Sequence, residues 1–258
     1  MPAPYERSAD LYDSIHGGKP FADECRALRA VVERRRPGAR TLLDVGCGTG
    51  AHLIHLREWI SVEGLDASEA MLAIARRKLP DVRLHRDDMR SFALDRRFDV
   101  VTSLFSAIGY ARSTDELSAA VATMARHLEP GGLLAIEPWL TPDQWRPGVK
   151  IHGGLMVDRD DYKLARFVVS ERRGRLAVIP MHHLVATLAG VEHFVETHEL
   201  FLAERPEIEQ AFAAAGLVDV EFVPDVLARG LWLGTHPGEV HACPRERLCA
   251  GGVGPGTP

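Results

Sequence analysis

The segment 42–50, read L-L-D-V-G-C-G-T-G, limits the possible folds of this chain more strongly than any other. Its first residues, Leu42 to Val45, form a short apolar run that predicts a buried strand, and a helical pattern begins at Ala51. Glycines lack a Cβ atom, so the turn between strand and helix can adopt left-handed angles and let a ligand approach the backbone. The three glycines of this turn are Gly46, Gly48 and Gly50.

Strand and helix patterns alternate from residue 41 to residue 137, which predicts an α/β fold with a parallel sheet and right-handed crossovers. Helices are expected on both faces of this Rossmann-like sheet. Strands are expected at 41–46, 61–66, 82–85, 98–104 and 133–137, and helices at 22–36, 51–60, 68–78 and 114–128.

The pattern changes to strands alone between residues 149 and 202, where turn signals separate runs at 162–170, 176–186 and 193–202. We expect an antiparallel insertion after the fifth parallel strand. A helix at 205–215 and strands ending at 223 and 233 then return to the first sheet. The expected organisation is a core with an N-terminal helical lead at 1–148, the insertion at 149–202, the return at 203–234 and a disordered tail at 235–258.

Composition excludes several classes of protein. A net charge of −5 argues against a nucleic-acid-binding surface, and no apolar run is long enough to span a membrane. The four cysteines show no C-x-x-C spacing and no signal-peptide pattern follows Met1, so free thiols in a cytoplasmic protein are expected. No metal site is expected, because adjacent histidines such as His182 and His183 point to opposite faces of a strand.

The glycine turn distinguishes between nucleotide-binding motifs. No Gly-Lys-Ser/Thr follows it, so it is not a phosphate-binding P-loop, and the third glycine of a dinucleotide fingerprint is missing, which argues against a nicotinamide dehydrogenase. The turn resembles motif I of the class I S-adenosylmethionine (SAM) methyltransferases. This resemblance implies that SAM binds at the carboxyl ends of the parallel strands, where such sheets hold their ligands.

Acidic residues follow the next strands at positions that suit this cofactor. Asp66 ends the second strand, where a carboxylate can accept hydrogen bonds from two ribose hydroxyls. Asp88 would accept from the adenine amine, and Met89 would cover the ring. A helix-capping role for Asp66 and a loop role for Asp88 are the structural alternatives. The predicted cofactor-binding residues are Tyr12, Asp44, Gly46, Gly48, Asp66, Ala67, Asp88, Met89 and Phe105.

Narrower segments extend the resemblance to the N-methyltransferases of deoxyaminosugar biosynthesis, which act on sugars carried by thymidine diphosphate (dTDP). The narrower segments are F-S-A-I-G-Y (105–110), I-E-P-W (136–139) and R-G-L-W-L-G (229–234), and A-D-L-Y-D (9–13) and D-M-R-S-F (88–92) match as well. The resemblance implies N,N-dimethylation of a nucleotide-linked amino sugar, with S-adenosylhomocysteine (SAH) as the second product. It also implies a homodimer in which the insertion covers the active site.

The same resemblance suggests roles for residues on the acceptor side. Tyr5 and Tyr110 are expected to orient the amine, with Tyr110 as a further candidate for relaying its proton. Arg229 matches an arginine that faces the nucleotide-sugar, and His182 and His198 match positions in the insertion. Packing alone for Tyr110, and a sheet position alone for the two histidines, remain open. The predicted acceptor-binding residues are Ser106, Trp139, His182 and Arg229.

Two other functions are compatible with the sequence. The first is methylation of another small molecule, at an oxygen, a carbon or a free amine, in which case Arg229 need not meet a diphosphate. The second is a protein that binds SAM without turnover, against which the acceptor-side tyrosines argue. Masses measured after incubation with SAM and candidate acceptors separate these possibilities.

Overall fold

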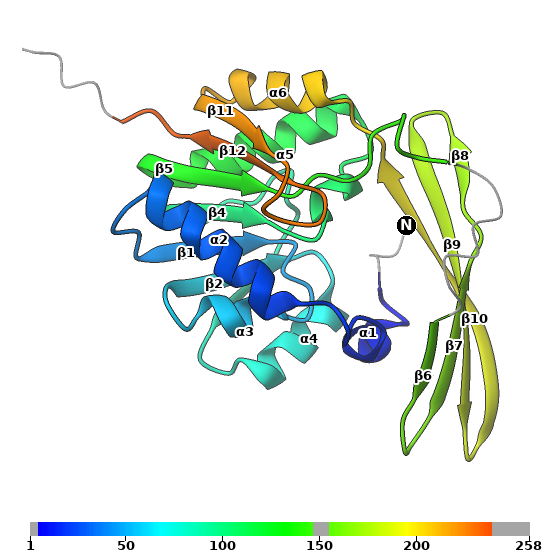
Figure 1. Ribbon diagram of the computed structural model, residues 1–258. Coiled ribbons are helices and arrows are strands. Elements are labelled where there is room, and N and C mark those ends of the chain that lie inside the picture. Colours follow the sequence, from blue (N-terminus) through cyan, green and yellow to red (C-terminus); the bar gives the residue numbers. More distant parts are fainter. Residues whose placement is uncertain (1–4, 147–154, 239–258) are drawn as a thin grey trace, which may run out of the picture.

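Two β-sheets stand side by side in the computed structural model, which describes residues 5–146 and 155–238 (Figure 1). The larger sheet has seven strands in the order β11-β12-β5-β4-β1-β2-β3, and β5, β4, β1, β2 and β3 run parallel. The smaller sheet is antiparallel, with the order β10-β9-β7-β6 and β8 paired to β9. The expected α/β fold with an antiparallel insertion after the fifth strand is confirmed.

The strand order places the reversal point of the large sheet between β1 and β4, where open α/β sheets bind their ligands. The strands of this sheet are β1 (Thr41–Val45), β2 (Ser61–Asp66), β3 (Arg83–Arg86), β4 (Phe98–Ser103), β5 (Leu128–Ile136), β11 (Val218–Val223) and β12 (Leu231–Thr235). The strands of the small sheet are β6 (Leu155–Asp158), β7 (Lys163–Val168), β8 (Glu171–Arg173), β9 (Leu176–Thr187) and β10 (Gly190–Phe201).

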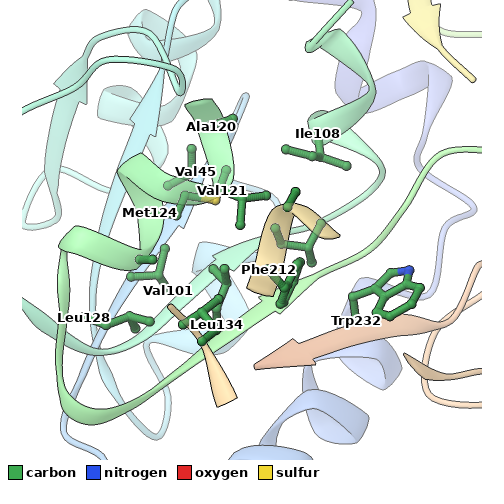
Figure 2. Packing of buried hydrophobic residues seen from close by; sticks show 14 of the residues in the cluster. Val45, Val101, Ile108, Ala120, Val121, Met124, Leu128, Leu134, Phe212 and Trp232 are labelled. Atoms are coloured by element: carbon green, nitrogen blue, oxygen red, sulfur yellow. The ribbon is translucent and has the colours of Figure 1, made fainter. Parts of the chain in front are cut away.

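Helices cover both faces of the large sheet, because successive strand residues point to opposite sides. Leu43 and Val101 join the core formed with α5 (Thr114–Arg126) and α6 (Arg205–Ala214), part of which Figure 2 shows. Leu42 and Val100 pack on the other side, in the core that contains residues of α2 (Phe21–Arg35), α3 (Leu53–Leu56) and α4 (Glu69–Lys78).

The N-terminal helix α1 (Ala9–Ile15) connects the two sheets (Figure 1). Ala9 packs against α4 through Met71, whereas Ile15 packs against Val157 and Leu164 of the small sheet. The Tyr162 hydroxyl also donates to Ser14 Oγ at 2.7 Å. The helix therefore forms one wall of the space between the sheets. No helix in the described ranges is long and apolar enough to cross a membrane.

Several element bounds differ from those expected from the sequence. The helix expected at 51–60 is shorter in the structure. Only the single turn α3 is helical, and non-helical turns precede and follow it. The helix expected at 114–128 ends at Arg126, and β5 begins at Leu128, ahead of the Pro-Gly-Gly segment. The small sheet contains β6 and β8 besides the three expected strands. Most of the expected tail, residues 239–258, lies outside the described residues.

Candidate active site

A cleft of about 840 Å³ opens between the carboxyl ends of the parallel strands and the small sheet. Its volume falls within the range of ligand-binding pockets in proteins. The lining residues come from α1, the ends of β1 and β2, the segment after β4, and β7, β9 and β10. Segments far apart in the sequence thus meet at one site.

The glycine loop forms the floor of this cleft. Gly46 has φ +80°, and a Cβ there would lie 2.5 Å from Ala107 Cβ, so the position admits no larger residue without movement. Its N–H donates to Leu65 O at 2.7 Å, which fixes the loop against β2. The backbone of Gly46 and Gly48 lines the cleft directly. The loop therefore presents main chain, and not side chains, to a ligand.

Asp66 is held at the end of β2 by backbone donors. Its two carboxylate oxygens accept from the N–H groups of Gly48 and Ser68, each at 2.8 Å. Ser68 Oγ in turn accepts from Met71 N and caps α4. Burial raises the pKa of Asp66, and the two backbone hydrogen bonds oppose that shift. The carboxylate lines the cleft with lone pairs left for hydroxyl donors, which is the chemistry that a ribose requires.

Two other predicted cofactor residues lie in different surroundings. Asp44 is buried between β1 and β4, accepts from Thr102 Oγ1 at 2.7 Å, and is not among the described residues that line the cleft. Burial raises its pKa to about 6. Asp88 lines the cleft, but its Oδ1 accepts from Arg90 Nε at 2.8 Å, and this partner lowers its pKa. Ala67, Met89 and Tyr12 also line the cleft.

The segment after β4 carries backbone strain. Phe105 and Ser106 have φ values of +50° and +61°, a region that residues with a Cβ rarely adopt and that often marks functional sites. Phe105 N donates to Glu137 Oε2 at 2.6 Å, and Ser106 Oγ donates to Pro138 O at 2.6 Å. The fully buried Glu137 and the chain after β5 thus hold this turn against the cleft.

Arg229 reaches the same region from the loop before β12. Its Nη1 lies 3.6 Å from Glu137 Oε1, and its guanidinium lies 4.8 Å from the centre of the Trp139 ring. Burial raises the pKa of Glu137, and the charge of Arg229 opposes that shift. Arg229 and Trp139 both line the cleft, as does Ser106.

An aromatic cluster occupies the end of the cleft below the small sheet. The Tyr110 hydroxyl and His198 Nδ1 share a hydrogen bond of 2.7 Å, and the Tyr5 ring centre lies 4.4 Å from that of His198 and 5.2 Å from that of Tyr12. Burial raises the pKa of all three tyrosine hydroxyls. Burial also lowers the pKa of His198 from an ordinary 6.5 to about 4, so its imidazole is neutral at pH 7.

The small sheet brings residues to the cleft that the sequence did not identify. These are Arg166 of β7 and Glu196 of β10, which line it beside His198, a residue that the sequence did single out; His16, directly after α1, lines it too. His182 is absent from the described lining; its ring stacks on His193 with centres 5.4 Å apart. Strand alternation places His182 on the opposite face of β9 from its neighbour His183. No motif in the insertion marks Arg166, and only the pairing of the strands reveals it.

The described residues contain no group of three or more His, Cys, Asp or Glu side chains that could hold a metal ion.

Comparison with known proteins identifies relatives over most of the chain. Residues 42–132 match the family model of a methyltransferase domain. The chain is 43% identical to the dTDP-3-amino-3,4,6-trideoxy-alpha-D-glucopyranose N,N-dimethyltransferase of Streptomyces venezuelae, covering 88% of this chain and 96% of the relative. It is 44% identical to the dTDP-3-amino-3,6-dideoxy-alpha-D-glucopyranose N,N-dimethyltransferase of Streptomyces fradiae, covering 88% and 89%.

A solved structure agrees with these sequence matches. The SAM-bound amino pentose methyltransferase of Micromonospora echinaspora superimposes with a TM-score of 0.78 at 41% identity, covering 88% of this chain and 95% of that one.

Proposed function

Because the chain belongs to the family of dTDP-aminosugar N,N-dimethyltransferases, we propose that it methylates the amine of a nucleotide-linked amino sugar, twice in succession. SAM is its cofactor and methyl transfer its reaction class. The observation that supports the acceptor best is the continuity of the cleft, which joins the Asp66 carboxylate to the cluster of Tyr5, Tyr110 and His198. One space thus contains a ribose-binding group and aligned hydrogen-bonding groups for an amine.

The floor of the cleft suits the cofactor. Asp66 would accept from the ribose hydroxyls, Asp88 and Met89 would contact the adenine, and the glycine loop would carry the methionyl part beside Tyr12. Ala67 and Phe105 line the same surface, and Asp44 would act from beneath it. Bound SAM supplies an electrophilic methyl group, so transfer to a neutral amine demands mainly proximity and orientation.

The aromatic cluster would orient the acceptor amine. Burial disfavours the charged phenolate forms of Tyr5 and Tyr110 and so raises the pKa of both hydroxyls. Both hydroxyls therefore stay protonated and act as hydrogen-bonding groups. An amine held by Tyr110 must lose its proton before it can attack, because free alkyl amines are mostly protonated at pH 7. The neutral His198 ring, bonded to Tyr110, fixes the direction of that hydroxyl and extends a path for the proton.

Arg229 would bind the diphosphate of the acceptor as a charged donor, between Trp139 and Ser106. His182 would not contact the acceptor directly in this proposal, because its ring faces away from the cleft. Arg229→Ala should raise the KM for the nucleotide-sugar and leave the KM for SAM unchanged. A KM for the nucleotide-sugar equal to that of the wild type would remove this assignment.

The experiment that tests the function is incubation with SAM and a panel of dTDP-linked amino sugars, read by mass spectrometry. Two added methyl groups on a sugar of the panel are expected, whereas one added methyl group would reject the second transfer. Methylation of another small molecule, with every sugar unchanged, would favour the alternative acceptors. Binding of SAM without consumption for any acceptor would favour a non-catalytic role.

We also propose that the outer face of the small sheet forms a homodimer interface. Strand pairing gathers exposed apolar side chains there: Met156, Phe167, Leu184 and Val195 are 71%, 42%, 38% and 40% exposed. Sedimentation of the wild type should give a dimer and Phe167→Asp a monomer. Val218→Asp, at an exposed apolar residue of the large sheet, is the control and should remain dimeric. A monomeric wild type would reject the interface.

A cytoplasmic location completes the proposal. Cys25 and Cys47 are buried free thiols, which is the usual state of cysteines in a reducing compartment. Retention of the protein in the cytoplasmic fraction of its source cells is the expected result.

A further inference from the structure

The arginines of the cleft differ in whether a carboxylate neutralises them. Five described residues that line the cleft are arginines, and four of these form ion pairs. The paired side chains are Arg7 with Glu192 at 2.6 Å, Arg90 with Glu116 at 2.8 Å, Arg112 with Glu199 at 3.2 Å and Arg229 with Glu137 at 3.6 Å. The fifth is Arg166.

Arg166 has no such partner among residues 5–146 and 155–238, where it makes neither an ion pair nor a side-chain hydrogen bond. Glu196, a carboxylate of β10 on the same face of the small sheet, accepts from the Arg7 backbone N–H at 2.8 Å and lies beyond ion-pair distance of Arg166. The charge of Arg166 is therefore left uncompensated inside the cleft.

Strand pairing directs this side chain toward the ligands. Arg166 of β7 pairs with His183 of β9, which pairs with Phe194 of β10, so the three side chains share the face that covers the cleft. The guanidinium lies near enough to α1 that its charge, after burial, lowers the pKa of His16 to about 4. Arg166 also lines the same cleft as Tyr12 of α1 and His16, which follows α1.

An unpaired guanidinium in a partly buried position is unfavourable, because it loses water without gaining a counter-charge. It stays protonated at every physiological pH, and its planar fork of donors matches the oxygens of carboxylates and phosphates. Both reactants of the proposed function carry such oxygens, as the methionyl carboxylate of SAM and as the diphosphate of the acceptor.

We propose that the Arg166 guanidinium binds an oxyanion of a ligand in the cleft. The ligand would thus supply to Arg166 the negative charge that protein carboxylates supply to the other four arginines. This inference rests on the proposed function for the identity of the ligands. The methionyl carboxylate and the nucleotide diphosphate are the two sources of that oxyanion.

Equilibrium titration of the full-length protein tests this proposal without turnover. SAH is compared with 5′-methylthioadenosine, which lacks the carboxylate, and dTDP is compared with thymidine, which lacks the diphosphate. In Arg166→Gln we expect the affinity for one charged ligand to fall about ten- to a hundredfold, as for loss of a charged hydrogen bond. Its uncharged counterpart should bind as to the wild type. A loss confined to SAH assigns the carboxylate, and one confined to dTDP assigns the diphosphate.

Two further variants control for folding and for charge. Lys163→Gln removes an exposed cation of the same strand, already paired with Asp158, and should leave all four affinities unchanged. Arg166→Lys should retain part of the lost affinity. Because Arg166 is unpaired in the free protein, the melting temperature of Arg166→Gln should equal or exceed that of the wild type.

The results that overturn the proposal are distinct from failure of the proposed function. Wild-type affinity of Arg166→Gln for both SAH and dTDP would refute an oxyanion site. Equal loss for all four ligands with a lower melting temperature would instead assign Arg166 a structural role, and would also refute it. If no amino sugar is methylated, the acceptor is wrong, yet the SAH comparison still tests Arg166.

Discussion

The floor and the roof of the cleft satisfy their polar groups in opposite ways. On the floor, defined by residues 46–48 and 66–68, the Asp66 carboxylate takes both of its hydrogen bonds from backbone N–H groups. On the roof, defined by Arg166, Glu196 and His198, two buried polar atoms lack partners within the described chain: Oε2 of Glu196 and Nε2 of His198.

This difference indicates which ligand each region serves. A floor whose carboxylate is fixed by backbone hydrogen bonds before binding is preorganised, so it suits a cofactor that is the same in every turnover. Unpartnered buried groups are unfavourable, and they persist where a ligand can supply the missing partners. We therefore expect the roof to determine which acceptor binds.

The largest expected effect comes from adding a side chain to the glycine loop of the floor. Gly46→Ala would place a Cβ 2.5 Å from Ala107 Cβ at a residue with φ +80°, so the loop must move. We expect SAH binding to become undetectable by calorimetry and the free energy of unfolding to fall by about 1–3 kcal/mol. Gly18→Ala is the control, because a Cβ there meets no atom within 4 Å. Loss of dTDP binding as well would show that floor and roof are not independent.

A smaller loss should follow from Asp66→Asn. An amide nitrogen would then face the N–H of Gly48 or Ser68, and a charged acceptor for the ribose would be gone. We expect about a ten- to hundredfold weaker affinity for SAH, with dTDP affinity retained. The exposed Glu69→Gln at the start of α4 is the matched control. An Asp66→Asn protein that binds SAH normally would remove Asp66 from the cofactor site.

The junction of floor and roof is tested by Tyr110→Phe. Without the hydroxyl that bonds His198 at 2.7 Å, we expect kcat to fall roughly two- to a hundredfold while the KM for SAM stays constant. Tyr162→Phe, whose hydroxyl bonds Ser14 outside the cleft, should keep the wild-type rate. A rate unchanged by Tyr110→Phe would leave this residue a packing role alone.

The last prediction concerns the stability of the roof in acid. His198 is neutral in the folded protein down to a pH near 4, whereas in the unfolded chain it takes up a proton near pH 6.5. Between these values the unfolded state binds more protons, so stability falls as the pH falls, by at most about 3 kcal/mol for this group. Asp44, whose pKa burial raises to about 6, contributes with the opposite sign.

Thermal melts of wild type and His198→Gln between pH 7 and pH 4 isolate this contribution. The variant should lose less stability than the wild type on acidification, and His55→Gln, at a partly exposed histidine, should follow the wild type. Parallel curves for wild type and His198→Gln would contradict a buried, neutral imidazole at this position.

The sequence could predict the floor because its interactions are local. Asp66, Ser68 and Met71 lie within one strand–helix turn, and Gly48 lies in the loop that follows β1, the strand with which β2 pairs directly. Asp44 shows the limit of this reasoning, since a motif residue points into the sheet toward Thr102 and not into the cleft.

The roof could not be predicted in the same way, because both faces of its strands carry a mixture of polar and apolar residues. A shift of one residue in the pairing register of a strand decides whether a side chain faces the cleft or the outer surface. His182 thus faces outward on β9, whereas His198 lies against Tyr5 and Tyr110.

The sequence by itself determined the fold class, the glycine loop and the acidic residue that follows the second strand, because short-range backbone geometry and strand–helix alternation specify them. Only the tertiary structure decided what faces the floor. The pairing of β7, β9 and β10, together with their packing on α1, brings Arg166 and His198 into the cleft. Those contacts join residues more than a hundred positions from the glycine loop, and no local pattern encodes them.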